Sequence, residues 1–142
     1  MGNPQREPMS SAARRATAEV TVNDTRRKKF AAIAGVELVE LVLQETFTGE
    51  IEGESEVRAL QAVRSDRSVS QVSMQTFSGR LHGRQGSFAL QGSGRVDEGK
   101  IDASWSVVPG SGTRDLAGLR GDGGFKGEFG KGSTATLDYW FE

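Results

Sequence analysis

Glycine is concentrated in the second half of this chain, and this distribution constrains the fold more than any other feature. Fifteen of the 19 glycines lie after residue 78 in a chain of 142 residues. Glycine weakens both helices and strands, so long regular helices are disfavoured there and short extended segments between turns remain. The second half of the chain therefore predicts an all-β structure.

Short segments in which polar and apolar residues alternate lie between the glycine clusters. In Ile101–Val107 the odd-numbered residues are apolar and the even-numbered residues are polar, which is typical of a strand with one buried face. The preceding Asp97-Glu98-Gly99 indicates a tight turn. Strands are predicted on this basis at Val72–Phe77, Ser87–Gln91, Ile101–Val108 and Thr134–Phe141.

The first half of the chain is also predicted to be extended. Thr17–Asn23 is rich in β-branched residues and predicts a first strand, which the basic run Arg26–Lys29 then interrupts. Apolar residues predict a strand over Val36–Phe47, although the alanines just before Gly35 favour a helix. Glu52–Arg64 could be helical by composition, but its flanking glycines and turn residues favour a hairpin partner of that strand.

The chain has the length of one domain. Residues 1–16 are polar and contain two of the three prolines, so they are expected to form a disordered N-terminal tail. Residues 17–142 are expected to form the domain. With so many short strands, closure into a single antiparallel β-barrel would remove the exposed sheet edges.

Several kinds of site are excluded by composition. The chain has no cysteine and one histidine, His82, so thiolate zinc sites, disulfides and two-histidine metal motifs are excluded. No apolar run approaches the ~20 residues needed to span a bilayer. We expect a cytoplasmic protein with no membrane partner, no metal and no cofactor.

Charge is distributed unevenly along the chain. The first 30 residues carry a net charge of +4 and the rest carry −5. A basic arm can bind nucleic acid, but only Phe30 adjoins the basic run, whereas single-strand binders use several stacking rings. Nucleic-acid binding is therefore the weakest of the functional hypotheses, and a solvated strand end or turn is favoured.

Four carboxylates alternate with other residues at Glu50, Glu52, Glu54 and Glu56. In a strand all four would lie on one face, and a solvated face is the favoured interpretation. A buried member would have a raised pKa and could act as a general acid or base. Glu52 and Glu54 are the best catalytic candidates by this reasoning.

The large aromatic residues either fill the interior of the barrel or line a ligand cavity. Polar residues that alternate with apolar neighbours are candidate polar groups in such a cavity, and Gln75 joins the catalytic candidates for this reason. His82 lies beside a turn and is expected at the surface. The candidate substrate-binding residues are Gln91, Trp105, Phe77, Phe88, Asp138 and Tyr139.

The glycine-rich segment Gly110–Gly124 lacks both the dinucleotide pattern and the P-loop pattern for binding phosphate. Its glycines are instead expected to form tight corners between strands.

Four segments resemble a small bacterial family, domain of unknown function family 3224, which is grouped with the allene oxide cyclase-like barrels. These segments are Phe47–Ser55, Gly83–Phe88, Trp105–Phe125 and Thr136–Tyr139. The resemblance covers about Thr46 to Glu142 in the same order and spacing. It implies an eight-stranded antiparallel barrel with a central cavity.

The chain departs from the family pattern at three places. It has Val22–Arg27 where the family usually has Trp followed by an acid, Gln75 where a glutamate is common, and Gly92 where a histidine is common. If the family's cavity chemistry uses these positions, this member has lost that chemistry or changed its substrate.

Two main hypotheses for function remain. The first is a cofactor-independent isomerase or cyclase that holds a small hydrophobic molecule inside the barrel, by analogy with the fold. The alternative is a non-catalytic barrel that binds a ligand or a protein, which the changed positions favour. Such barrels often associate through an outer face, so a homo-oligomer is expected.

Overall fold

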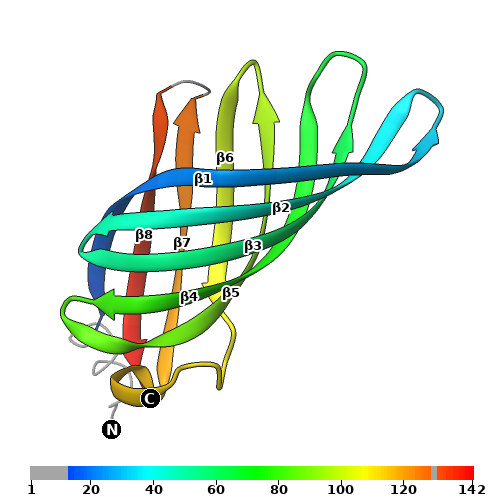
Figure 1. Cartoon of the computed structure of the whole chain (residues 1–142). Helices are drawn as coiled ribbons and strands as arrows, with labels where there is room; N and C mark the ends of the chain where they lie inside the picture. The colour runs from blue at the N-terminus through cyan, green and yellow to red at the C-terminus, as the bar shows by residue number, and fades with distance from the viewer. Residues whose placement is uncertain (1–12, 129–130) are drawn as a thin grey trace, which may run out of the picture.

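The computed structural model describes residues 13–128 and 131–142. Eight strands form one closed antiparallel barrel in which each strand pairs with its neighbours in sequence, and β1 pairs with β8 (Figure 1). The predicted eight-stranded barrel is therefore confirmed. The elements are β1 (Arg14–Ile33), β2 (Val36–Gly49), β3 (Ile51–Val63), β4 (Val69–Leu81), β5 (Arg84–Asp97), β6 (Lys100–Val107), the 3-10 helix η1 (Arg114–Leu116), β7 (Leu119–Glu128) and β8 (Gly132–Phe141).

Figure 1 shows β1 to β4 crossing the front of the barrel, with β6, β7 and β8 running nearly at right angles to them behind. The tip of the β1–β2 hairpin projects to the right, away from β6 to β8. In the described part of the chain, no helix has the length and apolar character needed to cross a membrane.

β1 is longer than the sequence predicts. Residues 1–12 of the expected tail lie outside the described residues, whereas Arg14, Arg15 and Ala16 already belong to β1. The prediction that the basic run interrupts the strand is wrong, because β1 continues through Arg26–Lys29 and pairs with β2. Two bulges accompany this extension.

Cross-strand acids and solvent accommodate the basic run in β1. Lys28 lies opposite Glu40, and the Lys29 Nζ atom is 3.6 Å from Glu37 Oε2. Both faces of β1 are exposed between Thr21 and Phe30, so successive cations that point to opposite faces all remain hydrated. Local charge therefore does not end the strand.

β1 and β8 close the barrel along only part of β1. They pair from Arg14, which lies opposite Tyr139, to Val20, which lies opposite Ser133. We call this pairing the seam. Among the described residues, the part of β1 beyond Val20 has a hydrogen-bonded neighbour on one side only, namely β2. The barrel wall is therefore interrupted beside the distal half of β1.

The glycine-rich segment contains a strand that the sequence analysis missed. Gly121, Gly123, Gly124 and Gly127 lie inside β7, and none of them has a positive φ. The interpretation of Gly121, Gly123 and Gly124 as corners is therefore wrong. A Cβ atom at Gly123 would collide with the carbonyl oxygen of Thr136 on β8, so glycine here permits a close approach of the neighbouring strand.

Other local predictions are confirmed. The strands predicted over Val36–Phe47 and in the segment after Glu52 are β2 and β3, and they form a hairpin. The turn predicted at Asp97-Glu98-Gly99 joins β5 to β6, and its Gly99 has a φ of 78°.

Aromatic side chains fill the end of the barrel closed by the seam. Phe77 is 1% exposed, and its ring centroid lies 5.0 Å from that of Phe88 and 5.5 Å from that of Phe47. Trp105 stacks on Phe47 at 6.2 Å and contacts Phe125 at 5.5 Å. We call these five residues the aromatic cluster; four of them belong to the hydrophobic core, and Phe125 is partly buried and packs against it.

The loop between β6 and β7 covers part of the same end of the barrel. Leu116 in η1 is fully buried within the core. The Ser111 and Thr113 hydroxyls accept hydrogen bonds from the backbone N–H groups of Ala89 and Ser87, at 3.1 and 3.0 Å. The loop therefore satisfies backbone groups at the end of β5 where β6 has stopped.

Candidate functional site

Three polar side chains lie inside the barrel beside the aromatic cluster. Glu45, Ser55 and Gln75 are 7%, 4% and 6% exposed, and they are the buried polar or charged residues of the described chain. We call them the polar layer. Burial of a charged group without a cation is costly, so such a residue is a candidate for function.

The strand register brings these three residues together. Glu45 points inward because it has the same phase on β2 as Phe47, which belongs to the core. Ser55 on β3 lies directly opposite Glu45. The Nε2 atom of Gln75 on β4 donates a hydrogen bond of 2.8 Å to the Ser55 Oγ atom. The polar layer therefore spans three adjacent strands.

Burial strongly changes the acidity of Glu45. It raises the pKa of the Glu45 carboxyl to about 7, and a polar contact with the Gln75 side chain offsets part of that rise. No lysine, arginine or histidine of the described chain forms an ion pair with Glu45. At neutral pH the carboxyl is therefore present in both its protonated and its ionised form.

Glu45 lies close to the end of the seam. Its cross-strand partner on β1 is Val22, which is the first residue beyond Val20 to face the same side of the sheet. Val22 is 49% exposed although it faces the interior. Solvent therefore reaches the interior face of the barrel at Val22, which lies directly beside Glu45 on the neighbouring strand.

A second polar network lies at the end of the barrel closed by the seam. The His82 Nδ1 atom is 2.6 Å from the Tyr139 hydroxyl, and its Nε2 atom is 3.6 Å from Glu50 Oε2. The His82 side chain is only 15% exposed, so the prediction that His82 is a surface residue is wrong even though it lies in the β4–β5 turn. The His82 side chain is oriented toward the interior by its contact with the Tyr139 hydroxyl.

The remaining bonds of Glu50 attach this network to β1. The Thr17 backbone N–H donates a hydrogen bond of 2.9 Å to Glu50 Oε1. That bond is the main reason why the pKa of Glu50 is lowered, and the interaction of Glu50 with His82 is a smaller cause. Burial raises the pKa of Tyr139. The network therefore joins β1 and β8 to the β2–β3 and β4–β5 turns at this end of the barrel.

The carboxylates proposed as catalytic lie outside the barrel. Glu52 and Glu54 are exposed on the outer face of β3, in agreement with the favoured solvated face for this row. Gln75 is buried, so the structure does not bring Glu52 or Glu54 to Gln75.

Two of the residues proposed to bind substrate also face outward. Gln91 is exposed on β5. Asp138 on β8 forms a bidentate ion pair with Arg15, with an Nε to Oδ1 distance of 2.7 Å. The hydrogen bonds from Arg15 lower the pKa of Asp138. Asp138 therefore supports the outer side of the seam.

The other four residues proposed to bind substrate lie in the interior. Phe77, Phe88 and Trp105 belong to the aromatic cluster, and Tyr139 belongs to the same hydrophobic core. The Trp105 Nε1–H donates a hydrogen bond of 3.1 Å to the carbonyl oxygen of Thr136. These side chains pack together at the closed end of the barrel. Phe77 lies directly opposite Ser55, so the polar layer borders this packed region.

Glu45 and Ser55 were not among the predicted site residues, although the sequence contained a signal for Glu45. Val39, Leu41, Leu43, Glu45 and Phe47 alternate along one strand, so Glu45 occupies an apolar phase. A carboxylate in that phase is expected to be buried. Ser55 carried the same kind of signal, because it lies in the phase of Ile51 and Val57 on its strand.

Residues 13–128 and 131–142 contain no group of three or more His, Cys, Asp or Glu side chains that could hold a metal ion. The chemistry available in the polar layer is therefore that of one carboxyl, one amide and one hydroxyl.

Comparisons with known proteins agree with the fold and the sequence motifs. A family model described as "Protein of unknown function (DUF3224)" matches residues 15–139. The chain is also similar to the crystal structure of a protein with unknown function from the DUF3224 family of Shewanella oneidensis MR-1. The two are 30% identical with a TM-score of 0.74, over 92% of this chain and 98% of that chain. No curated protein matches.

The family model covers most of the chain and confirms the resemblance that its motifs indicated. The chain belongs to the DUF3224 family of proteins of unknown function.

Proposed function

We propose that this barrel binds a small, largely apolar organic molecule beside Glu45 and moves a proton within it, as a cofactor-independent isomerase or cyclase. The observation that carries this proposal is the buried Glu45 carboxyl, whose pKa is raised to about 7 and which has no cationic partner in the described chain. A general acid or base works best when its pKa is close to the operating pH.

The surroundings of Glu45 favour an apolar ligand. Leu43 and Phe47 flank it on β2, and Val22 lies opposite it on β1. The ligand would enter beyond the end of the seam, where Val22 is half-exposed. The aromatic cluster would form the floor of the site, and the closed end would remain packed.

The proposed reaction needs no oxidant or co-reactant. The Glu45 carboxylate removes a proton from a carbon atom next to an unsaturated group, so the C–H bond breaks and its electron pair enters that group. The protonated Glu45 then returns the proton at another position. In this proposal, the Gln75 amide and the Ser55 hydroxyl, which bond to each other beside Glu45, would stabilise charge that develops on a ligand oxygen.

A carbon acid with a chromophoric product tests the proposed base directly. We would use 5-nitrobenzisoxazole, a small apolar molecule. When a carboxylate removes the proton from its C3 atom, the N–O bond breaks and a coloured nitrophenolate forms. Glu45→Gln should lower the rate at least ~100-fold, because it removes the base. The wild-type rate should rise with pH and level off above about 7.

Glu52→Gln is the matched control, because it removes an exposed carboxyl from the outer face of β3. Its rate should equal that of the wild type. The proposal is contradicted if the wild type is no faster than the same concentration of acetate, or if Glu52→Gln loses as much rate as Glu45→Gln. A probe that binds near Glu45 without reacting would favour the non-catalytic ligand-binding alternative.

A further inference from the structure

The outer faces of β3 and β4 change from polar to apolar halfway along the strands. Near the closed end, the outward residues are Glu52, Glu54, Glu56, Thr76 and Ser78. Farther along, three large apolar side chains point outward instead and are 52%, 56% and 55% exposed. These residues are Leu60, Val72 and Met74, which we call the apolar patch.

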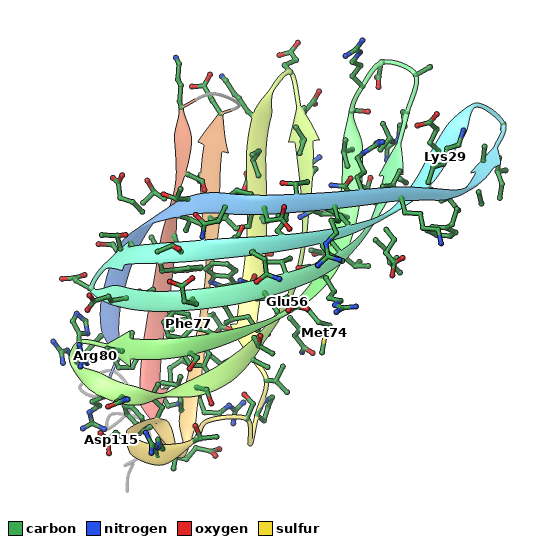
Figure 2. All side chains as sticks on the ribbon, viewed as in Figure 1. Lys29, Glu56, Met74, Phe77, Arg80 and Asp115 are labelled. Carbon is green, nitrogen blue, oxygen red and sulfur yellow. The ribbon has the colours of Figure 1, made fainter. Side chains whose placement is uncertain are left out.

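The register makes the apolar patch continuous. Leu60 lies directly opposite Val72, and Met74 follows Val72 on the outer face of β4. A surface hollow of about 490 Å³ is lined by the three residues of the patch together with Glu40 and Arg58. Figure 2 shows Met74 projecting from the outer side of the front wall, whereas Phe77 on the same strand lies behind the ribbon.

The barrel does not need an apolar surface at this position. The inward side chains of β3 and β4 supply the apolar face of this wall, and Ala59, which lies next to Leu60, is 3% exposed. Outward positions of a barrel in water are normally polar, so contiguous exposed apolar side chains indicate an interaction surface.

Charged groups of opposite sign border the apolar patch. Glu40 on β2 lies between Lys28 on β1 and Leu60 on β3, and it forms no ion pair with any residue in the described chain. Arg58 lies opposite Met74 and uses its Nε and Nη2 atoms to bind Glu56 at 3.1 and 2.9 Å. Its Nη1 atom makes no hydrogen bond within the described chain, so it can bind a second carboxylate.

An acid and a base beside one apolar surface make that surface self-complementary. In a twofold dimer the same patch is used by both copies, so each residue meets a different residue of the other copy. Such an arrangement can place Glu40 of each copy against Arg58 of the other, around an apolar centre. A partner of a single charge sign would match only one of these two borders.

The free edge of β1 is a poorer surface for self-association. An antiparallel pair of two β1 strands would bring the two Arg26–Lys29 runs together, and like charges side by side oppose this. We propose that a second copy of this chain docks on the apolar patch in a twofold arrangement, with Glu40 of each copy paired with Arg58 of the other. This proposal does not depend on the proposed function of Glu45.

The first test measures the mass of the wild type and of patch variants in solution by sedimentation equilibrium, between about 1 and 100 µM. The wild type should change from monomer to dimer in this range. Leu60→Lys and Val72→Lys should each raise the dissociation constant at least ~10-fold, because each buries a charge in the contact. Ile33→Lys is the control, since Ile33 is a 67% exposed apolar residue outside the patch and its replacement should change nothing.

The second test exchanges the charges at the border of the patch. Glu40→Arg and Arg58→Glu should each weaken the dimer, because each places like charges together. An equimolar mixture of the two variants should form heterodimers, because both contacts then pair opposite charges again. Thermal unfolding of each variant alone shows whether it remains folded.

Three results would overturn the dimer. They are a wild type that stays monomeric up to about 100 µM, a dimer unaffected by both lysine variants, and a mixture of the charge variants that associates no better than each one alone.

Discussion

The closed end of the barrel and the region beyond the end of the seam use burial in opposite ways. At the closed end, each buried polar group that we describe has a protein partner, as in the contact between Tyr139 and His82, and aromatic and aliphatic side chains form the rest of the core. Beyond the end of the seam, Glu45 is buried without a cation, and its pKa is raised to about 7. The closed end therefore stabilises the fold, whereas Glu45 costs stability once it is ionised.

This difference indicates where to look for function in such a barrel. Aromatic residues are the most prominent side chains of the interior, but their contacts with one another explain their presence. Glu45 has no structural explanation of that kind. Natural proteins retain costly groups of this type mainly at functional sites.

The largest effect is expected from removing an aromatic ring at the closed end. Phe77→Ala should lower the free energy of unfolding by about 3 to 5 kcal/mol, because Phe77 is fully packed between Phe47 and Phe88. Urea unfolding followed by tryptophan fluorescence measures the change. A loss below about 1 kcal/mol would show that the aromatic cluster is not the centre of the core.

The next effect is a gain in stability from Glu45→Gln that depends on pH. Between pH 4.5 and about 7 the folded chain keeps the Glu45 proton that the unfolded chain has already lost, so the stability of the wild type falls as pH rises. Above about pH 7 this loss is complete. Glu45→Gln avoids it and should be more stable than the wild type by up to about 3 kcal/mol at pH 8.

The stability difference between Glu45→Gln and the wild type at low pH serves as the control. At pH 4 both proteins carry a neutral side chain at position 45, so the proton-linked part of the difference should vanish. Urea unfolding at pH 4, 6 and 8 measures it. A difference that does not change with pH would mean that the folded and unfolded states of the wild type hold the Glu45 proton equally.

A smaller effect is expected from the polar network at the closed end. Tyr139→Phe keeps the ring and removes the hydroxyl that lies 2.6 Å from His82 Nδ1. The free energy of unfolding should fall by about 1 kcal/mol, because His82 loses its buried partner. Urea unfolding at pH 8 measures this. An unchanged free energy of unfolding would mean that water replaces the hydroxyl and that the network contributes little to the stability of the closed end.

The smallest effect is expected on the part of β1 that projects beyond the seam. Arg27→Thr replaces an exposed residue that forms no ion pair in the described chain with a good strand former. The free energy of unfolding should change by less than about 0.5 kcal/mol. A loss as large as that of Tyr139→Phe would show that this stretch of β1 contributes to the stability of the barrel.

Much of the fold was predictable because alternation is a local property. The apolar phase of Ile101–Val107 and the turn at Gly99 were visible in a few residues each. β7 was not, because its glycines are explained by the closeness of β6 and β8, which only the folded structure reveals. The length of β1 was missed for a similar reason, since its basic residues are accommodated by acids on β2 and by solvent.

The candidate site was less predictable than the fold. Glu52 and Glu54 attracted attention as a carboxylate-rich pattern, yet that pattern belongs to the solvated face. Glu45 stands alone, and only its phase between Leu43 and Phe47 distinguishes it. Which carboxylate of a strand enters the core follows from the register of the whole sheet, so a search for acidic clusters selects the wrong face.

The most direct test of the account is the pKa of Glu45 itself. Carbon-13 NMR of the glutamate side-chain carboxyl groups, recorded from pH 4 to 9 with Glu45→Gln used to assign the resonance, follows that single group. We expect its titration midpoint near 7. A midpoint near the ordinary glutamate value of about 4.3 would mean that the carboxyl is solvated in the native state, and the proposed proton transfer would be contradicted.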